Sequence, residues 1–343
     1  MHQSGAISKY TVNLASPLRQ YQLPMADDPL HKVIPPELSG QRLDQALARM
    51  FPEYSRSRLK SWILQGFVTV DDREMRPRDA VEGGEQVSVT PQAEISIKSV
   101  AEAIDLDIVR EDDELLIVNK PAGLVVHPGA GNIRGTLMNG LLHHLPTLEE
   151  LPRAGIIHRL DKDTSGLLLI AKTLASHTAL VRALAARSIS RHYLAVCNGV
   201  LTGGGTIDAP IGRHPVDRLK MQVREDGGKP AITHYRVLER FRAHTFISVQ
   251  LETGRTHQIR VHFAHRRHAL VGDPVYGGRL QIPAGASPDL GKALGNFRRQ
   301  ALHAARLKFE HPKSGEQIDQ ECLPPDDFLS LLEVLRHDLE QVE

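Results

Sequence analysis

The sequence has little of several features that mark whole classes of protein. Its 343 residues include two cysteines, Cys197 and Cys322, which excludes a disulfide framework and favours a reducing cytoplasm. No apolar stretch approaches the roughly 20 residues that a membrane-spanning helix needs, and a run such as Leu167 to Ala171 has the length of a strand. The N-terminus also lacks the apolar core of a signal peptide. We therefore expect a cytoplasmic protein without a membrane segment.

The sequence carries almost no net charge, +1 at pH 7 with histidine neutral, but that average conceals an uneven distribution. Between Thr253 and Gly272 there are four arginines and no carboxylate, whereas residues 319–343 carry eight acids and a single arginine, Arg336. A basic segment combined with an acidic C-terminal tail is compatible with a nucleic-acid partner. No internal repeat or low-complexity tract accompanies this pattern.

The chain divides into a tail, a small unit and a large unit. Residues 1–34 contain three prolines and no sustained hydrophobic period, which predicts a flexible tail. The small unit is expected over residues 35–91. Within it, apolar residues recur at helical spacing from Leu43 to Met50, and Ser39 is the expected N-cap of that helix.

A second helix of the small unit is expected to begin at the cap Ser55 and to stop at Gly66. One face of this helix is apolar, formed by Leu59, Trp62 and Ile63. Alternating apolar residues then predict strands at 67–70 and 86–89. The small unit therefore combines two helices with a short sheet.

Residues 92–112 are expected to be a linker that contains a first strand near 106–109, and residues 113–343 form the large unit. Its strands are expected at residues 115–118, 166–171, 193–196, 232–238 and 246–251. Its helices are expected at residues 135–144, 174–186, 256–264 and 328–339, and residues 285–295 are expected to be a loop. Several strands follow one another without an intervening helix, which predicts an α+β fold with a largely antiparallel sheet.

The densest polar cluster is His-Arg-Leu-Asp-Lys-Asp-Thr-Ser-Gly, residues 158–166, which stands directly before an apolar strand. So many charges are costly in a core, so the cluster must line a surface or a site. A charged turn is the alternative interpretation, but apolar residues on both sides place the cluster at a strand end. There Asp161 could act as a nucleophile or a base, helped by an arginine that keeps it ionised.

Three further segments carry candidate residues. In residues 252–262, Arg260 lies on an expected helix and could pair with Asp161 or hold a phosphate, although an exposed basic helix would have the same spacing. Residues 119–129 predict a loop whose shape is fixed by proline and glycine. The segment 191–196 carries Tyr193 in the strand expected at 193–196, which by itself would be ordinary packing.

Together these segments resemble the RluA family of large-subunit ribosomal RNA pseudouridine synthases. HRLDKDTSG looks like the signature of that family, and four further segments are similar to its remaining motifs in the same order: NKPAGLVVHPGAGN, YLAV, ETGRTHQIRVH and LVGDPVYGG. Residues 38–90, with LSGQRLDQAL and SRSRLK, resemble the small S4 RNA-binding domain. The resemblance implies a pseudouridine synthase domain with a largely antiparallel mixed sheet and a C-terminal helix over 113–343, preceded by an S4-like α/β domain over 35–91.

The resemblance also implies roles for individual residues. Asp161 corresponds to the nucleophile, Arg159 to the arginine that flips the base, Tyr193 to the tyrosine that stacks on it, and Arg260 to the arginine that pairs with the carboxylate. Arg255 is a weaker candidate for a backbone phosphate. RNA-binding candidates in the S4-like domain are Arg42, Arg56, Arg58 and Lys60.

The implied activity is the isomerisation of uridine to pseudouridine in large-subunit (23S) ribosomal RNA, free or in a precursor particle. The target nucleotide must leave the stack, because its reacting atoms are otherwise hidden. The reaction involves no redox change, and the sequence has no dinucleotide-binding fingerprint, so no cofactor is expected. A monomer without a metal is the accompanying expectation.

Other functions remain open on the residues alone. Asp161-Lys162-Asp163-Thr164 partly matches the pattern of magnesium phosphohydrolases of the haloacid dehalogenase type, although His158 and Arg159 occupy the place of the required apolar strand. An RNA-binding protein with an inert body is a second alternative. A metal site is conceivable at three histidines, but their spacing provides no compact ligand set: His262, His265 and His268.

Overall fold

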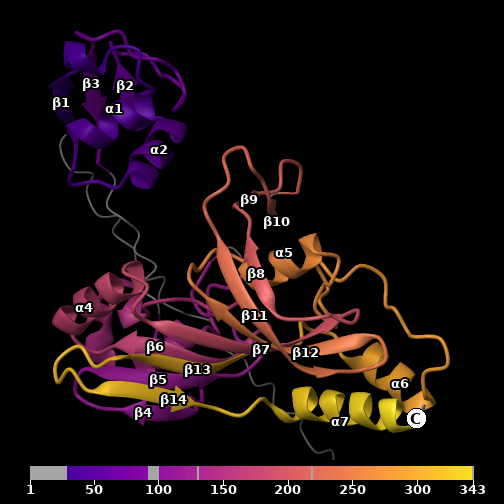
Figure 1. The fold of residues 1–343 in the computed structure, drawn as a ribbon. Helices are drawn as coiled ribbons and strands as arrows, with labels where there is room; N and C mark the ends of the chain where they lie inside the picture. Colours follow the sequence, from indigo (N-terminus) through magenta and orange to yellow (C-terminus); the bar gives the residue numbers. More distant parts are fainter. Residues whose placement is uncertain (1–28, 92–99, 130, 218, 342–343) are drawn as a thin grey trace, which may run out of the picture. The chain divides into compact units, whose positions relative to one another are not determined.

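The computed structural model describes residues 29–91, 100–129, 131–217 and 219–341, which form two compact units on either side of residues 92–99 (Figure 1). Most of the expected tail, residues 1–28, lies outside the described residues. Its end requires a correction, because Leu30–Val33 forms strand β1 of the small unit. The side chains of β1 are largely exposed, so no hydrophobic period reveals the strand; its pairing with a neighbouring strand defines it.

The small unit packs two helices on a three-stranded antiparallel sheet of order β1-β3-β2. Its α-helices are α1 (Leu43–Met50) and α2 (Arg56–Leu64), and its other two strands are β2 (Val68–Val70) and β3 (Gln86–Val89). Ser55 caps α2 as predicted, accepting a hydrogen bond from the Arg58 amide at 3.2 Å. The cap predicted at Ser39 is wrong, because α1 begins after Arg42 without a side-chain cap.

The large unit is built on a nine-stranded sheet in which β14 pairs with β13 beside the main path. Along that path the strands are β4 (Ile108–Glu111), β5 (Leu115–Lys120), β6 (Ser165–Ala171), β13 (Leu302–Glu310), β7 (Ser190–Asn198), β12 (His244–Leu251), β11 (Ile232–Arg240) and β8 (Gly205–Asp208), while β14 spans Gln317–Glu321. Among the described strands one pairing, β6 with β13, is parallel, so the predicted α+β class with a largely antiparallel sheet is confirmed. A separate hairpin follows β8, formed by β9 (Ile211–Arg213) and β10 (Met221–Val223).

Helices cover both faces of this sheet. The helices are α3 (Leu137–His144), α4 (Leu174–Ala185), α5 (Gln258–His265), α6 (Pro288–Asn296) and α7 (Asp326–Glu340). On β6, Leu168 and Ile170 join the core under α3 and α5, whereas Leu167 and Leu169 join the core under α4. Figure 1 shows α4 beside β6 at one end of the sheet and α6 and α7 beside β12 at the other. No described helix has the length and apolarity to cross a bilayer.

The loop predicted at residues 285–295 is wrong, because most of it forms α6. Gly291 and Gly295 lower the helix propensity by about 1 kcal/mol each relative to alanine. Ser287 caps the helix by accepting from the Leu290 amide at 3.2 Å, and Leu290 and Leu294 are buried against α7. Packing and capping together outweigh the two glycines.

The sheet is almost interrupted between β6 and β13. These strands pair over two residue pairs, at Ser165 and Gly166 of β6. A Cβ on Gly166, whose φ is +113°, would lie 2.3 Å from the Ala304 carbonyl oxygen, so the close approach requires glycine. Beyond this point the strands part, and residues 156–158 bond instead to the far half of β6. The polar cluster predicted from the sequence follows directly and therefore lies at this split.

Candidate active site

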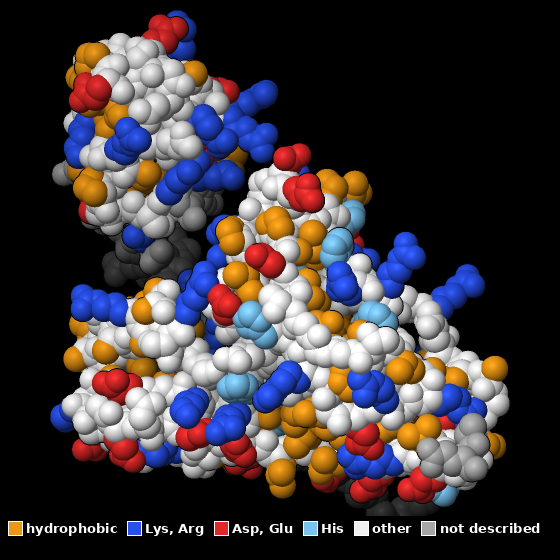
Figure 2. Space-filling view, viewed as in Figure 1, with side chains coloured by type: hydrophobic (Ala, Val, Ile, Leu, Met, Phe, Trp, Pro, Cys, Tyr) orange, Lys and Arg blue, Asp and Glu red, His pale blue; other side chains and the backbone are white. Residues whose placement is uncertain are grey.

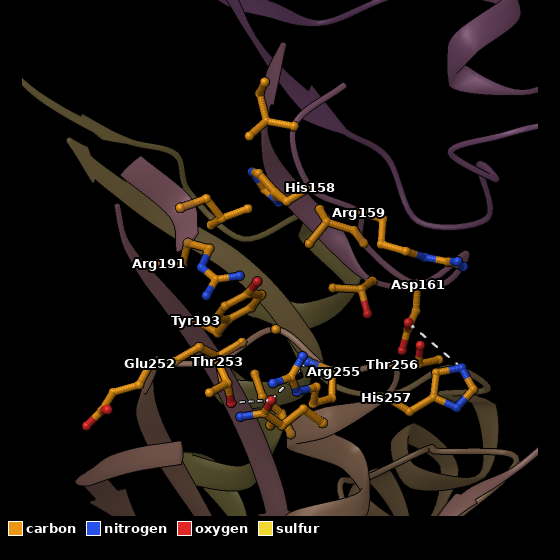
Figure 3. A pocket seen from close by; sticks show the side chains of 18 of the residues that line it. His158, Arg159, Asp161, Arg191, Tyr193, Glu252, Thr253, Arg255, Thr256 and His257 are labelled. Carbon is orange, nitrogen blue, oxygen red and sulfur yellow. Dashed lines mark hydrogen bonds and ion pairs between the residues drawn. The ribbon is translucent and has the colours of Figure 1, made fainter. Parts of the chain in front are cut away.

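A pocket of about 570 Å³ opens where β6 and β13 part (Figure 3). It is lined by the loop before β6, by β7, by the C-terminal half of α4, and by the turn that leads from β12 into α5. Its lining is strongly basic, with six arginines against two carboxylates: Arg153, Arg159, Arg187, Arg191, Arg255 and Arg260 against Asp161 and Glu252. All four predicted catalytic residues and Arg255 line this one pocket. A basic, concave site of this size suits an anionic ligand.

Lys120, whose side chain is completely buried, holds the loop that carries Asp161 in place. The Lys120 Nζ donates to three carbonyl oxygens, those of Pro121 at 2.7 Å and of Leu124 and Lys162 at 2.9 Å. Burial lowers the pKa of Lys120 to about 8, although Asp163 and Asp161 oppose the shift. The sequence marked this segment as a loop of fixed shape but did not reveal that its lysine supports the loop of Asp161.

Arg260 lies between two carboxylates. Its terminal nitrogen donates to Asp161 Oδ2 at 2.9 Å, and its other two nitrogens bind Asp273 at 2.7 and 2.9 Å. Burial opposes the positive charge, but the hydrogen bonds and charges of Asp273 and Asp161 outweigh it and raise the pKa of Arg260. The ion pair between Arg260 and Asp161 is the one that the resemblance implies. Asp273 lies within LVGDPVYGG, but the sequence predicts no role for it, since no spacing shows that it reaches Arg260.

The second oxygen of Asp161 faces His257. His257 Nε2 lies 3.8 Å from Asp161 Oδ1, and His257 Nδ1 lies 2.9 Å from the Tyr276 hydroxyl. The Tyr276 ring also packs against the Arg260 guanidinium, 5.1 Å from its centroid. His257 has a left-handed φ of +56°, which is uncommon for a residue other than glycine. The Asp161 carboxylate therefore has one oxygen fixed by Arg260, while the other lies beside His257, which also lines the pocket.

Tyr193 and Arg159 both line the pocket, in different surroundings. Tyr193 is buried on β7, and Figure 3 shows its ring in the pocket on the side opposite Asp161. Burial raises the pKa of Tyr193, and the charge of Asp161 acts in the same direction, so the phenol stays neutral. Arg159 is exposed on the loop two residues before Asp161. Their functions during catalysis remain predictions.

The candidates in the small unit show mixed environments. Arg42 and Arg56 both bind the buried carboxylate of Asp44, at distances from 2.8 to 3.2 Å. Arg58 lies over the Trp62 ring, 5.3 Å from its centroid, and Lys60 is exposed. Figure 2 shows Lys and Arg side chains gathered on the side of this unit that carries α2. The structure thus gives Arg42 and Arg56 an internal partner, and their contact with RNA remains a prediction.

The alternative functions gain no support from the site. Asp163, which a phosphohydrolase of the haloacid dehalogenase type would need beside Asp161, does not line the pocket, and no strand runs directly into Asp161. His262 is bonded on both ring nitrogens, to Thr233 Oγ1 and to the Ala209 carbonyl at 2.9 Å each. Within the described ranges no cluster of three or more metal-ligating side chains is present.

Comparison with known proteins identifies the class. Residues 114–265 match the RNA pseudouridylate synthase family, and residues 41–87 match the S4 domain family. The chain is 57% identical to ribosomal large subunit pseudouridine synthase D of Pseudomonas aeruginosa over 90% of its own length and 96% of that protein. The chain therefore belongs to the RNA pseudouridylate synthase family, as its motifs indicated, and is an RNA-modifying isomerase.

Two further relatives agree with this assignment. Ribosomal large subunit pseudouridine synthase D of Escherichia coli strain K12 is 54% identical over 88% of this chain and 93% of that protein. The solved structure of human RNA pseudouridylate synthase domain containing 4 superposes with a TM-score of 0.53 at 27% identity, covering 67% of this chain and 92% of that one.

Proposed function

We propose that this enzyme isomerises uridine to pseudouridine in large-subunit (23S) ribosomal RNA and that Asp161 is its nucleophile. The observation that carries the proposal is the asymmetric environment of the Asp161 carboxylate. Arg260 holds Oδ2 at 2.9 Å, which fixes the orientation of the group, while Oδ1 lies 3.8 Å from Nε2 of His257, beyond hydrogen-bond distance, in the lining of the pocket. A carboxylate placed in this way can attack or deprotonate a nucleoside without any further activation.

The reaction needs one carboxylate, and nothing is added or removed overall. The bond between C1′ and N1 of the nucleotide breaks, a bond between C1′ and C5 forms, the hydrogen on C5 leaves as a proton, and N1 gains a proton. Asp161 starts this sequence by attacking C1′, by adding to the uracil ring, or by removing the 2′ proton. These three routes use the same residue in the same place.

Access to the nucleotide is the task of Arg159 and Tyr193. A uridine in a stacked or paired strand must be flipped out before its C1′ and C5 can meet Asp161. Arg159 lies at the exposed edge of the pocket and fills the space that the base leaves, while the Tyr193 ring receives the base. Because Arg159 and Asp161 are two residues apart on one loop, flipping and chemistry are coupled.

The relatives and the small unit support the proposed substrate class. The relatives at 57% and 54% identity are named for the ribosomal large subunit, and the chain matches 96% and 93% of their lengths. The S4-like unit adds exposed cations, among them Lys60, for the phosphates of folded RNA. The enzyme acts as a cytoplasmic monomer on ribosomal RNA, free or in a precursor particle, and uses no cofactor.

The decisive experiment compares Asp161→Asn with Asp163→Asn. The amide of Asp161→Asn is nearly isosteric but is neither a nucleophile nor a useful base, so we expect turnover to fall by about 10³-fold or more while RNA still binds. The assay is tritium release from C5 of labelled uridine in ribosomal RNA transcripts. Asp163→Asn should retain turnover, because Asp163 does not line the pocket.

Three outcomes would contradict the proposal. Near-normal release by Asp161→Asn would remove Asp161 as the nucleophile. Complete loss with Asp163→Asn alone would favour the phosphohydrolase alternative. Absence of release by the wild-type enzyme on every ribosomal RNA transcript that it binds would favour a protein that binds RNA without modifying it.

A further inference from the structure

Arg191 is the unusual cation of the pocket. It projects from β7, is 6% exposed, and its Nε has no hydrogen-bond partner among the described residues. Its guanidinium forms no ion pair within that part of the chain either. A largely buried guanidinium without a counter-charge is costly, and the buried Nε of Arg191 makes no hydrogen bond that would offset the loss of water. The other buried arginine of the pocket, Arg260, has two carboxylate partners.

His158 places a second unpaired donor beside Arg191. His158 Nε2 accepts a hydrogen bond from the Leu169 amide at 3.3 Å, so in the neutral ring the hydrogen resides on Nδ1. Burial, together with the positive charge of Arg191, lowers the pKa of His158 to about 3, which keeps the ring neutral near pH 7. The Nδ1 atom is buried and has no partner among the described residues. In Figure 3 the side chain of Arg191 lies between those of His158 and Tyr193.

The turn before α5 provides the space that Arg191 occupies. A Cβ on Gly254 would lie 2.7 Å from Arg191 NH1, and the nearest neighbours of that Cβ all belong to this guanidinium. The absence of a side chain at residue 254 therefore lets the Arg191 guanidinium lie where it does. Arg191 and His158 both line the pocket, and the Arg191 guanidinium meets no carboxylate there among the described residues, so this part of the pocket suits an oxyanion.

We propose that Arg191 and His158 form a phosphate subsite that binds one backbone phosphate of the substrate RNA next to the flipped uridine. The inference rests on the proposed function and extends it to a specific contact. Uracil is neutral and offers only carbonyl acceptors, so the anion that balances Arg191 comes from the RNA backbone. This contact fixes the strand on the β7 side of the pocket, while Asp161 acts from the α5 side.

The test replaces single phosphates rather than only the protein side chain. The probe is a synthetic RNA stem-loop containing one uridine that the enzyme converts, located by the tritium assay on short transcripts, with one phosphate at a time replaced by a neutral methylphosphonate. Binding is measured in the Asp161→Asn background, with Arg191 intact or changed to Gln. We expect one replacement beside the uridine to weaken binding by about tenfold or more with Arg191 intact and to have no additional effect with Arg191→Gln.

Salt and stability measurements separate a phosphate contact from a structural role. Arg191→Gln should lower the slope of log Kd against log salt by about 0.7, as expected for one phosphate contact on a single strand. Its Tm should stay unchanged or rise, because an unpaired buried charge has been removed. A clear fall in Tm would show instead that Arg191 stabilises the fold, and would overturn the proposal.

Two further variants complete the design. Arg187→Gln removes an equal charge from the same pocket, but Arg187 is already paired with Glu252 at 2.5 Å, so its effect should be smaller and should not map to one phosphate. Gly254→Ala displaces the Arg191 guanidinium without removing its charge, and should weaken the same phosphate contact even if Arg191→Gln fails to fold. Identical methylphosphonate maps with and without Arg191 would overturn the subsite. Failure of the proposed function would appear separately, in the tritium assay.

Discussion

Two sides of the pocket each contain a buried arginine: Arg260 on the side formed by α5, here called the α5 wall, and Arg191 on the side formed by β7, the β7 wall. The two arginines differ in their charged partners. On the α5 wall, Arg260 forms ion pairs with Asp161 and Asp273, so its positive charge is balanced within the protein. On the β7 wall, Arg191 is equally buried but has no acidic partner among the described residues. The first arrangement fixes the geometry of the carboxylate proposed as the nucleophile. The second leaves a binding capacity that a ligand can fill, and the difference cannot be seen from burial alone.

The comparison makes opposite predictions for stability when a charge is removed. Asp273→Asn breaks the α5 wall by leaving Arg260 buried with Asp161 as its one carboxylate, so the free energy of unfolding should fall by about 3–5 kcal/mol. Thermal or denaturant unfolding measures this loss. Arg336→Gln, which breaks an exposed pair with Glu239, is the matched control and should cost less than about 1 kcal/mol. Equal losses for the two variants would contradict the structural role of Asp273.

Arg159→Ala distinguishes flipping from phosphate binding. Arg159 is exposed at the pocket edge and is proposed to fill the stack only after the base has left it. We expect kcat to fall about a hundredfold, equivalent to about 2.7 kcal/mol, while RNA affinity changes little. Single-turnover and equilibrium binding measurements separate the two effects. A loss of affinity with normal turnover at saturating RNA would place Arg159 with the phosphate contacts instead.

Acid should lower the stability of the protein through His158, which lies in the loop before β6. The pKa of His158 in the folded chain is about 3, below the ordinary value of 6.5, so the unfolded chain binds a proton first as pH falls. Stability from this group is complete above pH 6.5 and is lost towards pH 3, with a loss of about 2 kcal/mol by pH 5. His158→Gln keeps an acceptor for the Leu169 amide but does not titrate. Unfolding free energies at pH 7 and pH 5 should therefore differ less for the variant; the same difference in both proteins would refute this account.

Arg187→Gln gives the smallest expected effect on stability. Arg187 pairs with Glu252 at 2.5 Å, yet half of its side chain is exposed. Exposed ion pairs contribute about 0–1 kcal/mol, so the variant should unfold almost as the wild type does. If the free energy of unfolding fell as much as for Asp273→Asn, ion pairs would stabilise the protein equally whether they are exposed or buried, and burial of the pair would not matter.

Much of the fold could be predicted because its apolar residues repeat with a clear period. The strand predicted at residues 86–89 coincides with β3, and the helix predicted at 174–186 is α4. The edge strand β1 and helix α6 could not be predicted in the same way. β1 has few buried side chains, and the glycines of α6 suggest a loop unless its packing on α7 is known.

Only the residues of the candidate site that lie in recognisable sequence motifs could be predicted. The segments containing Asp161, Tyr193 and Arg260 meet in one pocket, as the resemblance implied. The pairing of Asp273 with Arg260 could not be predicted, because it depends on the turn that follows α5 and no residue spacing indicates that turn. The environment of Arg191 could not be predicted for a different reason. The lack of an acidic partner leaves no pattern in a sequence and can be recognised only once the neighbouring residues are placed in three dimensions.

The narrow junction between β6 and β13 has a mechanical consequence. Two residue pairs join these strands, fewer than join any other neighbouring strands of this sheet in the described part of the chain. The sheet therefore behaves mechanically as two rigid halves joined by the short β6–β13 pairing, and the pocket lies where this pairing ends. Spreading the halves to admit a nucleotide would break few backbone hydrogen bonds. The enzyme can therefore be compliant across its active site while each half of the sheet stays rigid.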